Sequence, residues 1–134
     1  MRILIFGLPG SGKTTLAKSF SDLIGGIHIQ EDRIDNSVEG HKEQALKIKH
    51  MCQGVELTGK IAVADFTCPL ENSRYIFDAD YTVFMDTIKE TEDESLNELF
   101  QQPMMCDYHA AQWFNDTHTQ LVEVVTSYME RNNA

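Results

Sequence analysis

The stretch GLPGSGKTT combines glycines, a lysine and two threonines at a spacing suited to binding phosphate, and it fits the P-loop pattern G-x-x-x-x-G-K-[ST]. Glycines let the backbone curl so that successive N–H groups face a phosphate, and the positive end of a following helix adds to the attraction. We expect Lys13 to reach the outer phosphates of ATP and the Thr14 hydroxyl to bind Mg²⁺. The predicted ATP-binding residues are Gly7, Leu8, Pro9, Gly10, Ser11, Gly12, Lys13, Thr14 and Thr15.

Three acidic residues follow apolar runs that are typical of buried strands. They are Asp32 after IHIQE, Asp65 after IAVA and Asp86 after YTVFM. Ligands of open α/β sheets collect at the carboxyl ends of the strands. Phosphoryl transfer requires magnesium and a carboxylate that orients or deprotonates the acceptor hydroxyl, so these three acids are the candidates. The alternative for each is an acid that only closes a strand or caps a helix.

The elements that must position these residues alternate between strand and helix. Continuous β-branched runs such as RILIF indicate strands of a parallel sheet buried on both faces. We expect strands at Arg2–Phe6, Ile27–Ile29, Ile61–Phe66 and Tyr81–Met85, and helices at Lys13–Ile24, Val38–Thr58, Glu71–Phe77, after Thr91 and from about Thr117. Thr91 and Glu94 fit a capping box, so we expect Thr91 to cap the helix that follows it. Between Tyr81–Met85 and the chain's end we expect helices only. The pattern predicts an α/β fold with three α/β/α layers around a parallel sheet, of the P-loop nucleotide-kinase type.

Length and charge limit the function further. The 134 residues suit a single domain, 1–134, and no repeat, linker or long apolar segment interrupts it. We therefore expect a cytoplasmic protein with no membrane segment. The net charge of −10 disfavours nucleic acid as a partner, but a small anionic substrate in a local basic pocket remains compatible with it. The three scattered cysteines argue against a disulfide framework and against a zinc site.

The segments IFGLPGSGKTTLA, HIQEDRI, GKIAVADFTCPLENSRYIFDADYTVFMDT and CDYH resemble the adenylylsulfate kinase family. Members of that family transfer the γ-phosphate of ATP to the 3′-hydroxyl of adenosine 5′-phosphosulfate (APS), a step of sulfate assimilation, and they often form dimers. The resemblance implies that Asp32 faces the acceptor hydroxyl and magnesium. It also implies that Phe66 packs against the substrate adenine and that Arg74 binds the substrate. A homodimer stays open.

The chain departs from the family pattern at several of these positions. The family's D-G-D-N motif reads QEDR here, which places Arg33 where an asparagine is expected. Asp65 replaces a serine, and its place at the end of a strand suggests a magnesium ligand. Cys68 replaces a serine that would face the substrate, so it is either a substrate contact or a small buried residue. The family's basic lid is reduced to an acidic stretch whose single cation is Lys89.

These observations together predict an ATP- and Mg²⁺-dependent kinase whose preferred acceptor is the 3′-hydroxyl of APS. Lys13, Asp32, Arg33 and Arg74 are the predicted catalytic residues, and Asp32, Phe66, Cys68 and Arg74 the predicted substrate contacts. Thr14 and Asp65 are the predicted metal ligands. Two alternatives remain open. One is a related kinase acting on a hydroxyl of a sugar, a nucleoside or a hydroxymethylated DNA base. The other is a nucleotide-binding module without catalytic activity.

Overall fold

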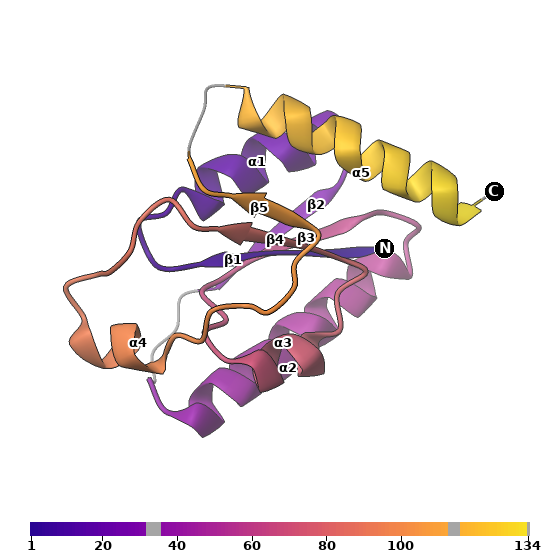
Figure 1. The fold of residues 1–134 in the computed structure, drawn as a ribbon. Coiled ribbons are helices and arrows are strands. Elements are labelled where there is room, and N and C mark those ends of the chain that lie inside the picture. The colour runs from indigo at the N-terminus through magenta and orange to yellow at the C-terminus, as the bar shows by residue number, and fades with distance from the viewer. Residues whose placement is uncertain (32–35, 113–115, 134) are drawn as a thin grey trace.

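A single five-stranded parallel sheet organises the chain. The computed structural model describes residues 1–31, 36–112 and 116–133. The strands are β1 (Arg2–Gly7), β2 (Ile27–Gln30), β3 (Ala62–Asp65), β4 (Tyr81–Met85) and β5 (Tyr108–Ala110), and they lie in the order β2-β3-β1-β4-β5 (Figure 1). All four strand pairs are parallel. The predicted α/β class with a parallel sheet is confirmed.

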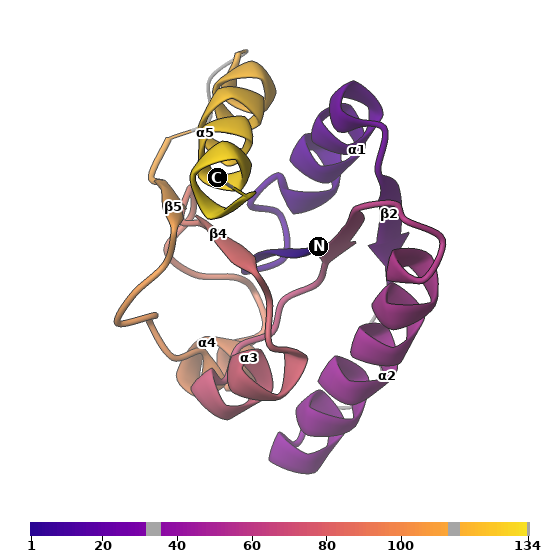
Figure 2. The same ribbon diagram turned by 90° about the vertical axis from the view of Figure 1, so that its right-hand side faces the viewer.

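Helices cover both faces of this sheet and complete the three layers. They are α1 (Lys13–Ile24), α2 (Val38–Glu56), α3 (Glu71–Phe77), α4 (Glu94–Leu99) and α5 (Thr117–Asn133). Helices α1 and α5 lie on one face, and α2 and α3 lie on the other (Figures 1 and 2). None of the helices within the described ranges is long and apolar enough to cross a membrane.

The core has two halves because successive strand residues point to opposite faces of the sheet. Ile3 and Ile5 of β1 pack towards α1 and α5 with Phe20 and Leu121. Leu4 and Phe6 of the same strand pack into the other half, towards α2 and α3. This is the reason that the strand sequences read as continuous apolar runs rather than as alternating ones.

The register of the strand pairs brings together the strand ends that carry polar residues. Asp65 of β3 is paired with Ile5 of β1 on one side and with Gln30 of β2 on the other. The other neighbour of β1 is β4, where Met85 is paired with Gly7 at the start of the glycine-rich loop. The carboxyl end of the sheet therefore joins that loop to Asp65 and Gln30.

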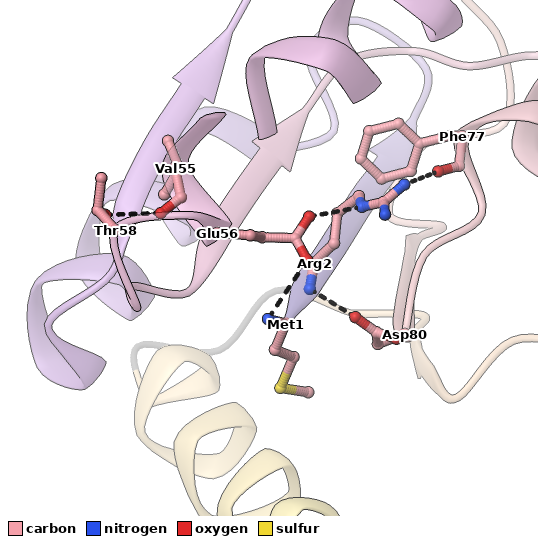
Figure 3. A network of polar contacts seen from close by, with 7 residues as sticks. All are labelled: Met1, Arg2, Val55, Glu56, Thr58, Phe77 and Asp80. Atoms are coloured by element: carbon pink, nitrogen blue, oxygen red, sulfur yellow. Dashed lines mark hydrogen bonds and ion pairs between the residues drawn. The ribbon is translucent and has the colours of Figure 1, made fainter. Parts of the chain in front are cut away.

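The opposite, amino-terminal edge of the sheet is fastened by Arg2. Its Nε donates to Glu56 at 2.9 Å and its Nη1 to the carbonyl oxygen of Phe77 at 2.6 Å, while its backbone N–H donates to Asp80 at 2.8 Å (Figure 3). The amino group of Met1 lies 3.5 Å from the same Glu56 carboxylate. Arg2 thus ties α2 to the turn after α3, at the end of β1 remote from the glycine-rich loop.

Two sequence expectations about the part of the chain after β4 were wrong. The segment after β4 is not entirely helical, because Tyr108–Ala110 adds a fifth strand beside β4. Helix α4 is capped by Asp93, whose carboxylate accepts from the N–H of Leu96, and not by Thr91. Both differences concern short elements of three and six residues, which lack room for a periodic pattern.

Candidate active site

The glycine-rich loop between β1 and α1 is shaped by positions that a side chain would obstruct. A Cβ on Gly7 would come within 2.5 Å of the backbone oxygen of Met85. Gly12 caps α1 in the left-handed conformation, with φ 96°, and offers no side chain to the first turn. The N–H groups at the start of this 12-residue helix therefore remain directed at a ligand. Together with the helix dipole they form a site for an anion.

Lys13 is held inside this loop. Its ammonium group donates to the carbonyl oxygen of Leu8 at 3.1 Å, and the residue is only 8% exposed. Burial lowers the pKa of Lys13 below its ordinary value, and the negative charge of Asp65 opposes that shift. Among the described residues no carboxylate pairs directly with this desolvated ammonium group, and such a group gains most when a phosphate arrives, which agrees with the predicted role of Lys13.

Thr14 and Asp65, the two predicted metal ligands, lie next to one another. The hydroxyl of Thr14 donates to Oδ1 of Asp65 at 3.3 Å and accepts from the side-chain amide of Gln30 at 3.0 Å. One hydroxyl and one carboxylate fit Mg²⁺ well, because this ion is usually bound by one or two protein oxygens, by phosphates of the substrate and by water. Within the described residues there is no cluster of three or more His, Cys, Asp or Glu side chains that would form a metal site of another kind.

A cavity of about 440 Å³ opens beside these groups. The glycine-rich loop and the first turn of α1 form one wall. The end of β2 and Gln44 of α2 form a second wall, and the end of β3 with the residues that follow it forms a third. The lining residues are Pro9, Gly10, Lys13, Thr14, Gln30, Glu31, Gln44, Asp65, Phe66 and Thr67. A second hollow of about 320 Å³ lies over Gly10 and Gly12–Thr15. The two hollows share Gly10, Lys13 and Thr14, so a phosphate chain bound on the loop would lead into the larger one.

Phe66 and Cys68, both predicted to contact the substrate, differ in their access to this cavity. Phe66 lines it, and its ring is fixed edge-on against Phe77 with 5.6 Å between centroids. Cys68 is absent from the lining and only 1% exposed, with a positive φ of 44°. Burial raises the pKa of the Cys68 thiol to about 12, so it stays neutral in the folded protein. The geometry favours a packing role for Cys68, and its contact with a substrate stays a prediction.

Arg74 is also absent from the lining of the cavity. Its guanidinium donates to the carbonyl oxygens of Cys68 and Gln101 at 2.9 and 2.7 Å and to the Glu71 carboxylate at 2.8 Å. The group lies 4.4 Å from the centroid of the Phe6 ring and is stacked over a second ring, Phe100. In this arrangement Arg74 joins the segment after β3 to the segment after α4. Its direct role in catalysis stays a prediction.

Asp86, the third predicted acid, has partners of its own on the far side of β1. Its carboxylate lies 2.9 Å from Nε2 of His109 and 3.3 Å from the Lys89 ammonium group. The next residue, Thr87, donates from its hydroxyl to the backbone oxygen of Ser11 in the glycine-rich loop at 2.7 Å. The end of β4 therefore supports the loop, whereas Asp65 faces the cavity. Asp32 and Arg33 lie outside the described residues.

Sequence reasoning missed three polar residues of this site: His28, Gln30 and Gln44. His28 lies 2.8 Å from Oδ2 of Asp65, and Gln44 lines the cavity with its amide nitrogen 3.3 Å from the carbonyl oxygen of Glu31. The available signal was the alternation in IHIQ, which places His28 and Gln30 on the same face of β2.

Comparisons with known proteins establish the fold. No profile of a known protein family and no curated protein matches the sequence. Three solved structures resemble the chain closely in shape. An APS kinase of Mycobacterium tuberculosis in complex with AMPPNP and APS has a TM-score of 0.75 and 12% identity, covering 93% of this chain and 96% of that chain. A sugar kinase from a Janibacter species has a TM-score of 0.69 and 12% identity, covering 96% of this chain and 94% of that chain. A gluconokinase from Sinorhizobium meliloti has a TM-score of 0.67 and 14% identity, covering 97% of this chain and 91% of that chain. At these identities the likeness shows a shared fold alone.

Proposed function

We propose that this protein is an ATP-dependent kinase that transfers the γ-phosphoryl group to a hydroxyl of a small molecule. The observation that carries the proposal is the contact between Thr14 and Asp65 at 3.3 Å, between the glycine-rich loop and the open cavity of about 440 Å³. Thr14 and Asp65 would serve the Mg²⁺ of a bound nucleotide, and the adjoining cavity provides room for an acceptor, which a loop that only bound nucleotide would not need. The similar structures described as kinases of APS, of a sugar and of gluconate support the same class.

Each group of residues in the site has its own role in this reaction. Backbone N–H groups of the loop and the Lys13 ammonium group bind the phosphates of ATP and balance their charge. Thr14 and Asp65 would hold the Mg²⁺ ion, which when bound would supply positive charge against the charge that develops during transfer. The cavity holds the acceptor, and Phe66 forms part of its wall.

Two residues outside the described ranges complete the proposal on the strength of the resemblance. Asp32 orients the acceptor hydroxyl and accepts its proton, and Arg33 supports charge on the transferred group. Asp32→Asn should therefore lower kcat far more than it weakens ATP binding. If Asp32→Asn turned over at the rate of the unaltered protein, Asp32 would not be the base.

APS is the first acceptor to test, because the sequence segments around the site resemble enzymes that phosphorylate it. The structure also favours a second candidate, an uncharged sugar or nucleoside hydroxyl. Among the described residues of the cavity lining, Lys13 is the one cation, and Glu31 and Asp65 are carboxylates. The guanidinium of Arg74 is occupied by its own partners. Among these described residues a doubly charged acceptor would find little compensation, so any further positive charge has to come from outside them, as from Arg33.

The deciding experiment measures ADP release from ATP and Mg²⁺ with a panel of acceptors. The panel contains APS, gluconate, shikimate, uncharged hexoses, nucleosides and hydroxymethyluracil DNA. A kcat/KM for APS at least tenfold above that of the uncharged acceptors supports APS, and the reverse order supports a neutral acceptor. Activity with the DNA that falls steeply with salt would support a nucleic-acid substrate. Measurable ATP binding without ADP release on any acceptor would contradict kinase activity and leave a binding module.

A further inference from the structure

Two side chains of β2 reach the pair formed by Thr14 and Asp65. In the ladder between β2 and β3, Gln30 is the partner of Asp65, and His28 is two residues earlier in the strand. Residues two apart in a strand point to the same face, so both side chains are directed at the same place. His28 Nε2 lies 2.8 Å from Oδ2 of Asp65, and Gln30 Nε2 donates to the Thr14 hydroxyl at 3.0 Å.

The Asp65 carboxylate is held from both of its oxygens. Oδ1 accepts from the Thr14 hydroxyl and Oδ2 is bonded to His28, while the residue is only 1% exposed. A buried carboxylate oxygen without a donor is costly, and an aspartate with one free oxygen can rotate about its side chain. His28 is mostly buried too, with 16% of its side chain exposed. The contact therefore fixes the orientation of Asp65 on the side away from Thr14.

The Thr14 hydroxyl is fixed in the same way. A hydroxyl has one hydrogen to donate and two lone pairs. Its hydrogen is directed at Asp65, and one lone pair accepts from Gln30. One lone pair is left, and its direction is set by the other two bonds. This is the geometry of an oxygen prepared to bind a cation rather than to donate to a ligand.

We propose that His28 and Gln30 are positioning residues that hold Asp65 and Thr14 in the arrangement that binds the divalent cation of the nucleotide. The inference rests on the proposed function, because it takes Thr14 and Asp65 as the ligands of that cation. It assigns β2 a part in metal binding. Removing a residue that hydrogen-bonds a metal ligand typically lowers metal affinity by about 10- to 100-fold.

The test measures binding of Mn²⁺ to the protein saturated with AMPPNP, by electron paramagnetic resonance. His28→Leu removes the donor and should weaken Mn²⁺ binding about 10- to 100-fold. His28→Gln places an amide N–H near the position of Nε2 and should restore affinity to within about threefold of the unaltered protein, an order-of-magnitude expectation for a preserved hydrogen bond. His50→Leu makes the same exchange at an exposed position of α2 and should change nothing.

Gln30→Ala provides a second line of evidence at an exposed position, where the fold does not depend on the side chain. It should weaken Mn²⁺ binding in the same ternary complex. The positioning role is wrong if His28→Leu and Gln30→Ala both bind Mn²⁺ as the unaltered protein does.

Asp65→Asn separates this inference from the proposed function. If Asp65→Asn weakens Mn²⁺ binding but the two β2 variants do not, the cation site stands and the positioning role is wrong. If Asp65→Asn binds Mn²⁺ normally, the assignment of the cation to Asp65 fails, and the positioning role fails with it.

Discussion

Replacing Arg74 by lysine tests whether this residue joins two segments of the fold or acts on the transferred phosphoryl group. Three guanidinium nitrogens donate to Cys68, Glu71 and Gln101, and the group lies between two phenylalanine rings. Burial lowers the pKa of Arg74 and the neighbouring Glu71 carboxylate opposes that shift, so the group is partly desolvated. A lysine keeps the positive charge but presents one nitrogen in place of a planar fork. The substitution therefore removes geometry rather than charge.

The loss of folding stability caused by Arg74→Lys follows from these contacts. A single ammonium group cannot reach the two backbone carbonyls and the carboxylate together, so at least one carbonyl loses its donor. A buried acceptor left unpaired costs about 1–3 kcal/mol. The lost stacking on the rings adds about 0.5–2 kcal/mol. We expect the free energy of unfolding to fall by about 1.5–5 kcal/mol. With a urea slope of about 2 kcal/mol per M, this lowers the urea midpoint by roughly 0.8–2.5 M.

Urea unfolding of Arg74→Lys measures this fall, with Arg131→Lys in the last turn of α5 as the matched exposed control. Activity is then compared without urea, where both variants are folded. A positioning role predicts a kcat within about threefold of the unaltered enzyme, because the charge itself does not contact the substrate. An unchanged urea midpoint together with a hundredfold loss of kcat would refute the positioning role and restore the catalytic one.

Three further predictions follow from the same contacts. Lys13→Ala should abolish ADP release while the protein stays folded, and activity within tenfold of the unaltered enzyme would remove Lys13 from the mechanism. Gly7→Ala should lower the thermal midpoint and the ATP affinity, since its Cβ would meet the Met85 oxygen at 2.5 Å; an unchanged midpoint would contradict this. The pKa of the Cys68 thiol is raised from 9.0 to about 12 in the folded protein, so the neutral thiol contributes to the free energy of unfolding in full below pH 9. Between pH 9 and pH 12 this contribution should fall by about 1.4 kcal/mol per pH unit, because only the unfolded chain loses the proton there. Cys68→Ala should flatten that part of the stability curve, and in the unaltered protein alkylation at pH 8 should label the partly exposed Cys106 before Cys68.

The predictable part of the fold is the part with long apolar runs and strong end signals. Helix α1 begins at Lys13 and ends at Ile24 as expected, because Gly25 adopts the left-handed conformation that closes it. Strand β4 also has the predicted bounds. By contrast, β5 has three residues of mixed burial and is recognised only by its pairing with β4. A pairing between distant segments has no counterpart in local sequence patterns.

The same distinction applies to the candidate site. The phosphate loop could be predicted because its residues are contiguous and their chemistry depends on that spacing. The contact of His28 with Asp65 joins residues 37 apart in the chain, and it depends on the register between β2 and β3. For Arg74, the position near a strand end suggested a substrate contact, which stays a prediction. Its neighbours in space are two carbonyls, the Glu71 carboxylate and two aromatic rings, none of which local sequence patterns indicate.

Two of the departures from the adenylylsulfate kinase pattern become neighbours in the folded chain. Gln30 stands where that pattern has its first acid, and Asp65 stands where it has a serine. The two residues are direct partners in the ladder between β2 and β3. Both residues lie at the carboxyl end of the sheet, and both contact the Thr14 hydroxyl. Since a cation responds to charge and distance rather than to the strand that supplies an oxygen, a carboxylate on β3 suits a cation beside Thr14 as well as one on β2 would.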